Sequence, residues 1–394
     1  MRILNATADF KWTGPAEPML NAILGLRALG HQVDLACPEP PPELEGQLLP
    51  MAQSRGIDPV LRLVRRRGYR PLRDREEVRR LREQLEKGGY EVLHVHHTRD
   101  QLLGRLATWR SPTRLVLSWH HGDPVGSLPW TRLRLGPRLA DGLVVLAPRL
   151  AEHARRELRW PESRVAVVPG SVDLERFRPR PRSSALRREL GLGEPHRVLM
   201  VVARLQPHRR FDLLLAAFER ALRRAPELRL VVLGRGTRAR EVLHEPVRER
   251  GLEGSVIHAG HRGEDYPELL ALADALVFLV PGSDGSCRAV LEAMATGVPA
   301  IVSRRGVLPE TVLDGETGRV VDEDLARLAD ALCDPARNPE RWQRFGRAAR
   351  ERVLARHGLV HAAGLLEAFY RRLLGAEPLG PRGACTLSSG RKAD

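Results

Sequence analysis

Two carboxylates, Asp284 and Glu292, flank a short segment of glycines and small residues. Asp284 lies in a turn-forming run, 281–286, and Glu292 lies one turn inside a helix-favouring run that ends at Gly297. Free backbone N–H groups at the start of a helix suit a phosphate, and here the acidic side chains flank those donors. The segment therefore predicts a binding site for a phosphorylated ligand.

An apolar run, 275–280, leads into this segment, and a second run, 298–303, follows it. Both runs are short and contain β-branched residues, which indicates buried parallel strands. With the helix between them they form a βαβ unit whose loop lies at the carboxyl end of the first strand. Open α/β sheets bind their ligands at that edge.

Two further loops follow predicted strands in the same half of the chain. Arg204 and Arg209 come after strand 197–203, and Gly234 and Gly236 come after the next strand. Because the carboxyl ends of parallel strands meet at one edge, we expect the three loops to converge there. Two guanidiniums can neutralise a diphosphate, and a Gly-x-Gly turn lets backbone pass close to a ligand. The alternative interpretation is that both arginines are surface residues of an arginine-rich chain.

The same alternation of strands and helices runs through nearly all of the chain, so the predicted fold class is α/β. The 394 residues are enough for two domains. We expect a Rossmann-like domain at 1–180 and a second one at 196–355, joined by a linker rich in Pro, Arg, Ser and Gly at 178–195. A last helix follows at 359–375, and the composition of 376–394 predicts a disordered tail.

The segment 284–299 resembles the signature of the retaining glycosyltransferase family 4, which has the GT-B fold. The family carries an acidic residue, a Gly-containing loop and a Glu eight positions after the first acid, which here are Asp284, Gly285 and Glu292. The signature continues with Ala293-Met294-Ala295 and Gly297-Val298-Pro299. The first acid is usually Glu in the family. The resemblance implies two Rossmann-like domains that face each other across a cleft, with helix 359–375 packed back on the acceptor-side first domain and the donor held by the second.

The resemblance also implies roles for individual residues. Arg204 and Arg209, the latter a Lys in the family, are aimed at the donor diphosphate, and Asp284 faces the donor sugar. His121 follows a strand end and precedes Gly122, where the family has a His near the transferred sugar. The implied catalytic set is Arg204, Arg209, Asp284 and His121. The implied donor-binding set is Glu292, Gly285, Ser286, Cys287, Arg288, Gly234, Gly236 and Gly14.

Glu292 accepts hydrogen bonds from the ribose hydroxyls in this scheme. The competing interpretation is an exposed pair with Arg288, one helical turn away, which would contribute only about 0.3–0.5 kcal/mol. We discard that pair here because the neighbouring apolar residues predict a mostly buried helix. A buried carboxylate needs a partner, and a ribose diol provides one.

Several other residues depart from the family pattern or carry a weaker signal. Gly14 precedes Pro15 where the family has a Gly pair, and it can still let a sugar or phosphate approach the backbone. Four further histidines are assigned to structure rather than to chemistry: His94, His96, His97 and His120.

The implied function is that of a retaining, metal-independent glycosyltransferase. It would move a sugar from a nucleotide-diphosphate donor to a glycan or lipid-linked acceptor, as in polysaccharide, lipopolysaccharide or glycolipid synthesis. No metal and no cofactor are expected, because the sequence lacks ligand clusters with metal spacing and the arginines supply the positive charge. The leaving phosphate would help to deprotonate the acceptor hydroxyl, and no residue is assigned as general base.

The chain is strongly basic, with a formal net charge of +15, and Lys11, Lys87 and Lys392 are its lysines. Arginine serves phosphate recognition well, although so general an excess also fits a coding bias. A basic surface admits nucleic acid, an anionic membrane or phosphorylated substrates as partners. An aromatic content of 4% and the lack of a nucleic-acid-binding motif argue against nucleic acid.

The pattern of 60–87 predicts one or two basic helices, either with an apolar stripe on the core and a solvated basic face or with a face that docks on anionic lipid. This segment favours an anionic or membrane-associated acceptor, together with Trp130, Arg132, Arg134 and Arg138. No apolar run approaches the roughly 20 residues of a membrane span, and no signal-peptide pattern opens the chain. The four cysteines show no CxxC spacing. We expect a cytoplasmic protein, and any contact with the inner face of the cytoplasmic membrane would be peripheral.

Three alternatives stay open. The same fold supports a nucleotide-sugar epimerase or a phosphorylase, which would turn over the donor without an acceptor. A basic α/β protein that binds nucleic acid is the second alternative. A protein that keeps the fold only for binding is the third, and Glu292 and Arg204 argue against it.

Overall fold

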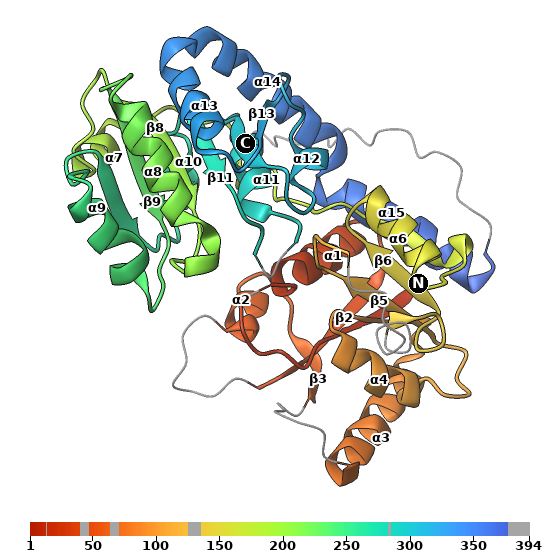
Figure 1. The fold of residues 1–394 in the computed structure, drawn as a ribbon. Coiled ribbons are helices and arrows are strands. Elements are labelled where there is room, and N and C mark those ends of the chain that lie inside the picture. Colours follow the sequence, from red (N-terminus) through yellow and green to blue (C-terminus); the bar gives the residue numbers. More distant parts are fainter. Residues whose placement is uncertain (13, 40–46, 64–70, 125–134, 283–284, 377–394) are drawn as a thin grey trace, which may run out of the picture.

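The computed structural model describes residues 1–12, 14–39, 47–63, 71–124, 135–282 and 285–376. It consists of two α/β lobes, each built on its own parallel sheet (Figure 1). The tail expected at 376–394 lies outside the described residues except for Ala376, and Trp130, Arg132 and Arg134 also lie outside them.

The first lobe contains seven described strands, all parallel, in the order β3-β2-β1-β4-β5-β6-β7. In β1, β4, β5 and β6 every residue is buried except the first one of β1 and of β5, as the sequence predicted for a sheet covered on both faces. Their bounds are β1 Arg2–Ala6, β2 Gln32–Pro38, β3 Pro59–Leu63, β4 Val92–Val95, β5 Arg114–Trp119, β6 Gly142–Val145 and β7 Val165–Val167. The helices of this lobe are α1 Ala16–Ala28, α2 Leu48–Gln53, α3 Pro71–Gly88, α4 Thr98–Ala107 and α6 Pro148–Arg156.

The second lobe contains six described strands, also parallel, in the order β10-β9-β8-β11-β12-β13. Their bounds are β8 Arg197–Val202, β9 Leu228–Leu233, β10 Val256–Gly260, β11 Ala275–Phe278, β12 Ala300–Ser303 and β13 Gly318–Val321. The helices are α7 Ser184–Glu189, α8 Phe211–Leu222, α9 Glu245–Glu249, α10 Tyr266–Leu270, α11 Arg288–Ala295, α12 Leu308–Thr311, α13 Leu325–Arg337 and α14 Pro339–Arg356. The predicted βαβ unit is therefore β11–α11–β12.

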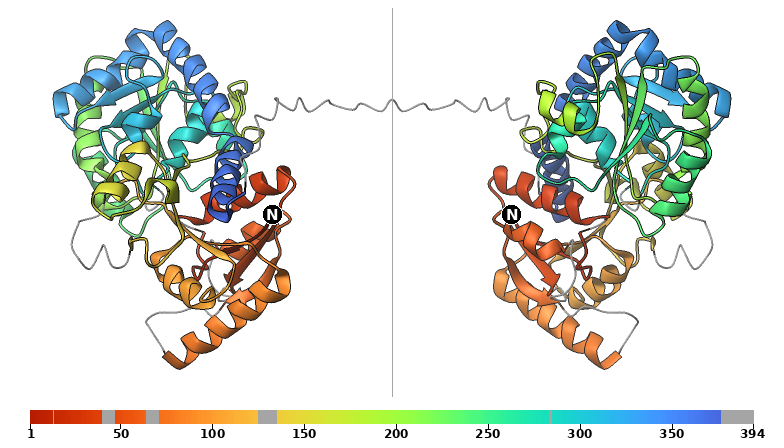
Figure 2. Two further views of the ribbon diagram at one scale, coloured as in Figure 1. Left: turned by 90° about the vertical axis from the view of Figure 1, so that its right-hand side faces the viewer. Right: turned by 90° about the vertical axis from the view of Figure 1, so that its left-hand side faces the viewer.

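The two lobes are joined twice. The chain passes forward between β7 and β8, and it returns through α14 and α15 Leu359–Leu374, which lies against α1 of the first lobe (Figure 2). Beside this return, the amide of Val172 donates to the carbonyl of His357 at 2.8 Å, and the ring of His357 bonds the carbonyl of Gly170 at 2.7 Å. The last helix thus packs on the first domain, as the resemblance implied.

The prediction for segment 60–87 was partly wrong. Its beginning belongs to the edge strand β3, and the helix α3 starts only at Pro71. From Asp74 to Lys87 this helix carries as many acidic as basic side chains, so its described part is not a basic face. The arginines that make the segment basic lie largely in 64–70, outside the described residues.

Smaller differences concern the ends of elements. The proline-rich segment 38–50 ends in α2, which begins at Leu48. A π-helical turn, Arg240–His244, precedes α9. The helix α4 was not predicted from the sequence. Among the described residues no helix is long and apolar enough to cross a bilayer.

The contact between α1 and α15 yields a test of the fold. A Cβ on Gly25 would lie 2.5 Å from the carbonyl oxygen of Leu359 and 2.8 Å from the Cβ of Ala363. Gly25→Ala should therefore lower the free energy of unfolding by about 1–3 kcal/mol, although alanine is the better helix former. Urea denaturation measures this difference.

The matched control is Gly364→Ala on α15, where an added Cβ would meet no heavy atom within 4 Å. This variant should raise the free energy of unfolding by up to about 1 kcal/mol, the gain in helix propensity. Equal effects of the two variants would mean that the backbones of α1 and α15 are not in close contact.

Candidate active site

The loop between β11 and α11 contacts the first lobe directly. The amide of Gly285 donates to the carbonyl of His120 at 2.7 Å. A Cβ on Gly285 would lie 2.2 Å from the amide nitrogen of Gly122, so only glycine fits here. The carboxyl edges of the two sheets therefore meet at this loop, and the predicted donor loop lies next to His121, which is exposed.

Arg209 lies in the loop after β8 and is mostly buried. Its Nη1 donates to the carbonyl of Val280 at 2.5 Å, and its guanidinium passes so close to Gly282 that a Cβ there would lie 2.6 Å from Nη2. Its Nε is buried and bonds none of the described residues. Burial lowers the pKa of Arg209, and the positive charge of Arg204 lowers it further, against the opposing influence of Cys287. An anion bound here would relieve both penalties.

Arg204 begins the same loop, and its side chain is exposed. Its positive charge contributes to the lowered pKa of Arg209, so the two guanidiniums lie within electrostatic reach of each other. The surface interpretation therefore fails for Arg209, which is held under the β11 loop, and stays open for Arg204.

Gly234 and Gly236 lie beside this loop for a reason that the sequence did not reveal. A Cβ on Gly234 would lie 1.9 Å from the carbonyl oxygen of Ala203, and one on Gly236 would lie 2.2 Å from that of Leu205. Glycine is thus required because the loop after β9 packs on the loop after β8. Whether these glycines also approach a ligand stays a prediction.

Glu292 lies on α11 with 7% of its surface exposed. Its Oε2 accepts a hydrogen bond of 2.8 Å from the hydroxyl of Tyr266, and its Oε1 lies 3.3 Å from Nε of Arg288. The predicted burial of Glu292 is confirmed, but the prediction that it does not pair with Arg288 is wrong, because the buried carboxylate has both Arg288 and Tyr266 as partners. Burial raises the pKa of Glu292, while Arg288 and Tyr266 act in the opposite direction.

Arg288 reaches from α11 to the first lobe. Its Nη1 lies 2.9 Å from Oε2 of Glu17 on α1, and Glu17 also accepts a bond of 2.7 Å from Nη2 of Arg55. No local sequence pattern indicated Glu17 or Tyr266 as part of this site. Both are distant in the chain from Glu292 and contact its surroundings only in the folded structure.

The other predicted donor-loop residues lie at the start of α11. Ser286 and Cys287 are buried. Ser286 lies against Gly170 of the first lobe, since a Cβ added to Gly170 would lie 2.5 Å from the Cβ of Ser286. Cys287 has a left-handed backbone, with φ of 55° and ψ of 46°, directly before the helix. Asp284 lies outside the described residues, so its role in facing the donor sugar stays a prediction.

Three of the four histidines assigned to structure form a stack under the edge that carries His121. Ring centroids are 4.4 Å apart for His94 and His96 and 5.3 Å apart for His96 and His120. His94 bonds Ser118 and Tyr370, each at 2.7 Å, so the stack is tied to α15. Burial lowers the pKa of His94 and of His120 to about 3, and that of His96 well below its usual value. The rings are therefore neutral.

Neutrality fixes the proton positions in this stack. Nε2 of His96 is 2.9 Å from the amide oxygen of Asn5, which can only accept, so this nitrogen carries the hydrogen. Nδ1 of His96 must then accept from Nε2 of His120, at 3.0 Å. This leaves Nδ1 of His120 as a buried acceptor that bonds none of the described residues. The structural assignment of these three histidines is consistent with their burial.

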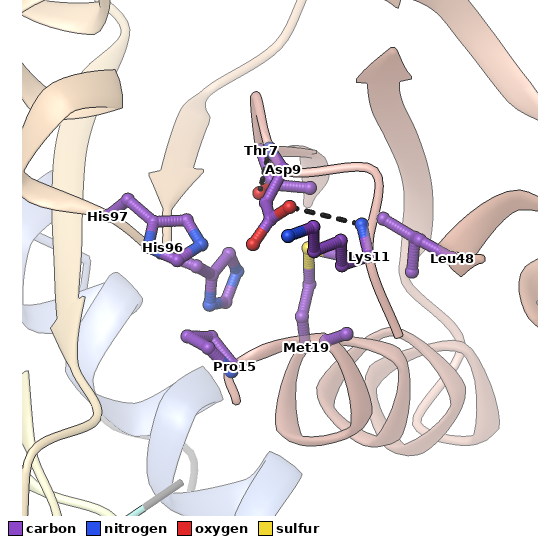
Figure 3. Close-up of a pocket in the computed structure, with 9 residues that line it drawn as sticks. Thr7, Asp9, Lys11, Pro15, Met19, Leu48, His96 and His97 are labelled. Atoms are coloured by element: carbon purple, nitrogen blue, oxygen red, sulfur yellow. Dashed lines mark hydrogen bonds between the residues drawn. The ribbon is translucent and has the colours of Figure 1, made fainter. Parts of the chain in front are cut away.

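A small pocket opens on the first lobe where β1 and β4 end above the start of α1 (Figure 3). It has an empty volume of about 190 Å³ including its open mouth. Polar and charged groups on its walls are Thr7, Asp9, Lys11, His96 and His97. Gly14, directly before Pro15 of this pocket, has a left-handed φ of 57°, so its backbone needs glycine or bears strain.

Comparison with known proteins agrees with this arrangement. The sequence model described as "Glycosyltransferase Family 4" matches residues 17–176, and the one described as "Glycosyl transferases group 1" matches residues 183–352. The two lobes and their shared edge define a GT-B glycosyltransferase.

The chain is similar to a GDP-mannose-dependent alpha-(1-6)-phosphatidylinositol monomannoside mannosyltransferase of Mycolicibacterium smegmatis. The two are 34% identical over 267 residues, which cover 64% of this chain and 69% of the relative. A D-inositol 3-phosphate glycosyltransferase of Streptomyces avermitilis is 32% identical over 288 residues, covering 66% and 61%. The crystal structure of Anabaena HepE in complex with UDP shares the fold, with a TM-score of 0.78 at 18% identity over 93% of this chain and 98% of that one. The chain belongs to glycosyltransferase family 4 and is an enzyme of that class.

The histidine stack generates a prediction about pH. Unfolded histidines bind a proton near pH 6.5, whereas the pKa of folded His94 is lowered to about 3 by burial. The unfolded state then binds more protons, so stability present above about pH 6.5 is lost as the pH falls toward 3. Each such histidine adds up to about 1.4 kcal/mol per pH unit to this loss.

His94→Gln keeps groups that can bond Ser118 and Tyr370 but cannot be protonated in this range. Its free energy of unfolding should therefore fall less steeply than that of the wild type between about pH 6.5 and about pH 5, by roughly 1 kcal/mol per pH unit. Urea denaturation at several pH values measures both slopes. Equal pH dependences of the free energy of unfolding in the two proteins would show that folding does not lower the pKa of His94.

Proposed function

We propose that this glycosyltransferase moves a sugar from a nucleoside-diphosphate donor to a hydroxyl of an anionic glycolipid or polyol-phosphate acceptor, with retention of configuration and without a metal ion. One observation carries the proposal. The buried Arg209 lies under the same loop that begins α11 and bonds the first lobe at His120. The positive charge of Arg209, the start of α11 and the carboxyl edge of the first sheet therefore lie close together.

Arg209 and Arg204 would bind the donor diphosphate. Their charge opposes the negative charge that develops on the leaving phosphate when the glycosidic bond breaks, which is the main electrostatic demand of the reaction. The hydrogen bond from Nη1 to the carbonyl of Val280 and the partial burial of the side chain restrict the guanidinium of Arg209, so little reorganisation is needed during the reaction. The same charge is the reason for proposing that no divalent ion is required.

Glu292 would hold the donor ribose. Its two oxygens have accepted one protein partner each, and an ionised carboxylate has about four acceptor positions. The two ribose hydroxyls can therefore bind without displacing Tyr266 or Arg288. Asp284 and His121 would face the transferred sugar, as the family resemblance implies. No described residue is proposed as a general base, and the leaving phosphate would accept the proton of the acceptor hydroxyl.

The relatives suggest the class of acceptor. The enzymes of Mycolicibacterium and Streptomyces are named for inositol-containing acceptors that carry phosphate. In this chain the pocket of Figure 3 offers Lys11, Thr7 and the two histidines His96 and His97 at the edge of the first domain. These groups suit hydroxyls and a phosphate, which supports a polyol-phosphate acceptor.

An exposed apolar stripe supports membrane contact. Leu102, Leu106 and Trp109 lie along and just after α4 and expose 40%, 43% and 60% of their surfaces. Their spacing places them on one side of the helix. Arg110, which is exposed, follows them. Such a stripe beside arginine suits the interface of an anionic bilayer.

The donor arginine gives the first functional prediction. Arg209→Gln should lower kcat by about a hundredfold or more, because it removes one of the positive charges proposed to face the leaving phosphate. The transfer assay uses GDP-mannose, UDP-glucose and ADP-glucose as donors and phosphatidylinositol as acceptor. The matched control is the neighbouring Arg210→Gln. Arg210 pairs with Glu323 and Asp212 instead, so the control should keep wild-type activity.

The same assay tests the finer parts of the proposal. Activity should persist with EDTA, and NMR should show the same anomeric configuration in product and donor. Turnover of the donor at an equal rate without any acceptor would favour the epimerase or phosphorylase alternative. Binding of RNA with no nucleotide-sugar turnover would contradict the proposed function.

The stripe gives a prediction about lipid binding. The double variant Leu106→Ser, Trp109→Ser should bind vesicles of phosphatidylcholine and phosphatidylglycerol about tenfold less than the wild type, since two apolar side chains no longer insert. Leu354 and Val360 are equally exposed on α14 and α15, and Leu354→Ser, Val360→Ser is the control that should bind normally. Cosedimentation measures both, and equal binding of the two double variants would exclude α4 as the docking face.

A further inference from the structure

Arg288 connects the two domains at the donor site. From the second domain, its guanidinium meets Oε2 of Glu17 on α1 at 2.9 Å and Oε1 of Glu292 at 3.3 Å. Glu17 itself exposes only 15% of its side chain and is held from the other side by Arg55 at 2.7 Å. The side chain that orients Glu292 is thus fixed by a carboxylate of the other domain.

This connection matters because of what Glu292 would bind. Its Oε2 is fixed by Tyr266, from its own domain, and its Oε1 is fixed by Arg288. Arg288 exposes 37% of its side chain, so loss of the Glu17 contact would give its guanidinium more freedom to move. The contact between Arg288 and Oε1 of Glu292 would then be less well oriented.

We propose that Glu17 is a positioning residue for the donor: from the acceptor-side domain it holds Arg288, and Arg288 holds Glu292 in the orientation that receives the ribose hydroxyls. The inference rests on the proposed function, because it assumes that Glu292 binds a ribose. It adds a residue of the first domain to donor recognition.

A consequence is that donor binding and the contact between the domains are coupled. If closure of the domains brings Glu17 onto Arg288 and so improves the hold on the ribose, then a bound donor must favour closure by the same factor. The coupling is electrostatic and partly exposed, so it should weaken in high salt.

The structure supplies a matched control for the loss of an interdomain ion pair. Nε of Arg149 on α6 lies 2.9 Å from Oε1 of Glu310 on α12, and the exposure of this pair is similar to that of Arg288. No contact of Glu310 with Glu292 is seen in the described part of the chain. Glu310→Gln therefore removes one carboxylate across the same interface and leaves the ribose contact in place.

The experiment measures binding of GDP, UDP and ADP and of their 2′-deoxy counterparts by calorimetry. In the wild type the best ribonucleotide should bind about tenfold or more tightly than its 2′-deoxy form, since that form lacks one hydroxyl for Glu292. Glu17→Gln should bind the ribonucleotide about fivefold to tenfold less tightly and should lose most of the discrimination. Glu310→Gln should keep both affinity and discrimination within about twofold.

The result that overturns the inference is a Glu17→Gln protein that keeps the wild-type preference for the ribonucleotide. A second measurement separates positioning from simple closure. In an Arg288→Gln background the further change Glu17→Gln should leave the 2′-deoxy preference unaltered, since no Arg288 remains for it to act through. A folded wild-type protein that binds none of the nucleotides would contradict the proposed function itself, whereas loss of the effect of Glu17 alone contradicts only this inference.

Discussion

The amide of Gly285 and the carbonyl of His120 form a 2.7 Å hydrogen bond that joins the carboxyl edges of the two sheets. The rest of the site depends on this contact. An added Cβ on Gly285 would overlap the backbone of Gly122, so the two edges approach as closely as main chains allow. The loop that begins α11 is therefore positioned by both domains.

Charge is distributed unevenly around this loop. On the side of β8, the buried Arg209 and the exposed Arg204 repel each other, and burial adds to the cost of ionising Arg209. On the side of α11, Arg288 lies between Glu17 and Glu292 and is compensated by both. Among the described residues, Arg288 is paired with carboxylates, whereas Arg209 donates to a main-chain carbonyl. This difference is the reason for proposing the diphosphate on the side of β8 and the ribose beside Glu292.

Much of this could be predicted from the sequence, and the exceptions have physical causes. The unit β11–α11–β12 was predictable because apolar runs and Gly297 define it locally. Strand β3 was missed because it is a partly exposed edge strand whose pattern also fits a helix. The pair of Glu292 with Arg288 was discarded on the assumption that burial and pairing exclude each other. Tyr266 pairs with Glu292, and Glu17 pairs with Arg288. Both partners come from distant segments of the chain, and no local sequence pattern predicts such contacts.

The Gly-x-Gly turn after β9 lies where the sequence predicted it, but packing against another loop is enough to require its glycines. Gly234 and Gly236 lie against the carbonyls of Ala203 and Leu205, so the turn supports the loop that carries Arg204 and Arg209. A side chain at either glycine would collide with the main chain of the loop that carries both arginines. Close packing alone therefore explains these glycines, and a change at either one would also displace Arg204 and Arg209. If these arginines bind the donor diphosphate as proposed, main-chain packing beneath their loop positions the charge that faces the leaving group.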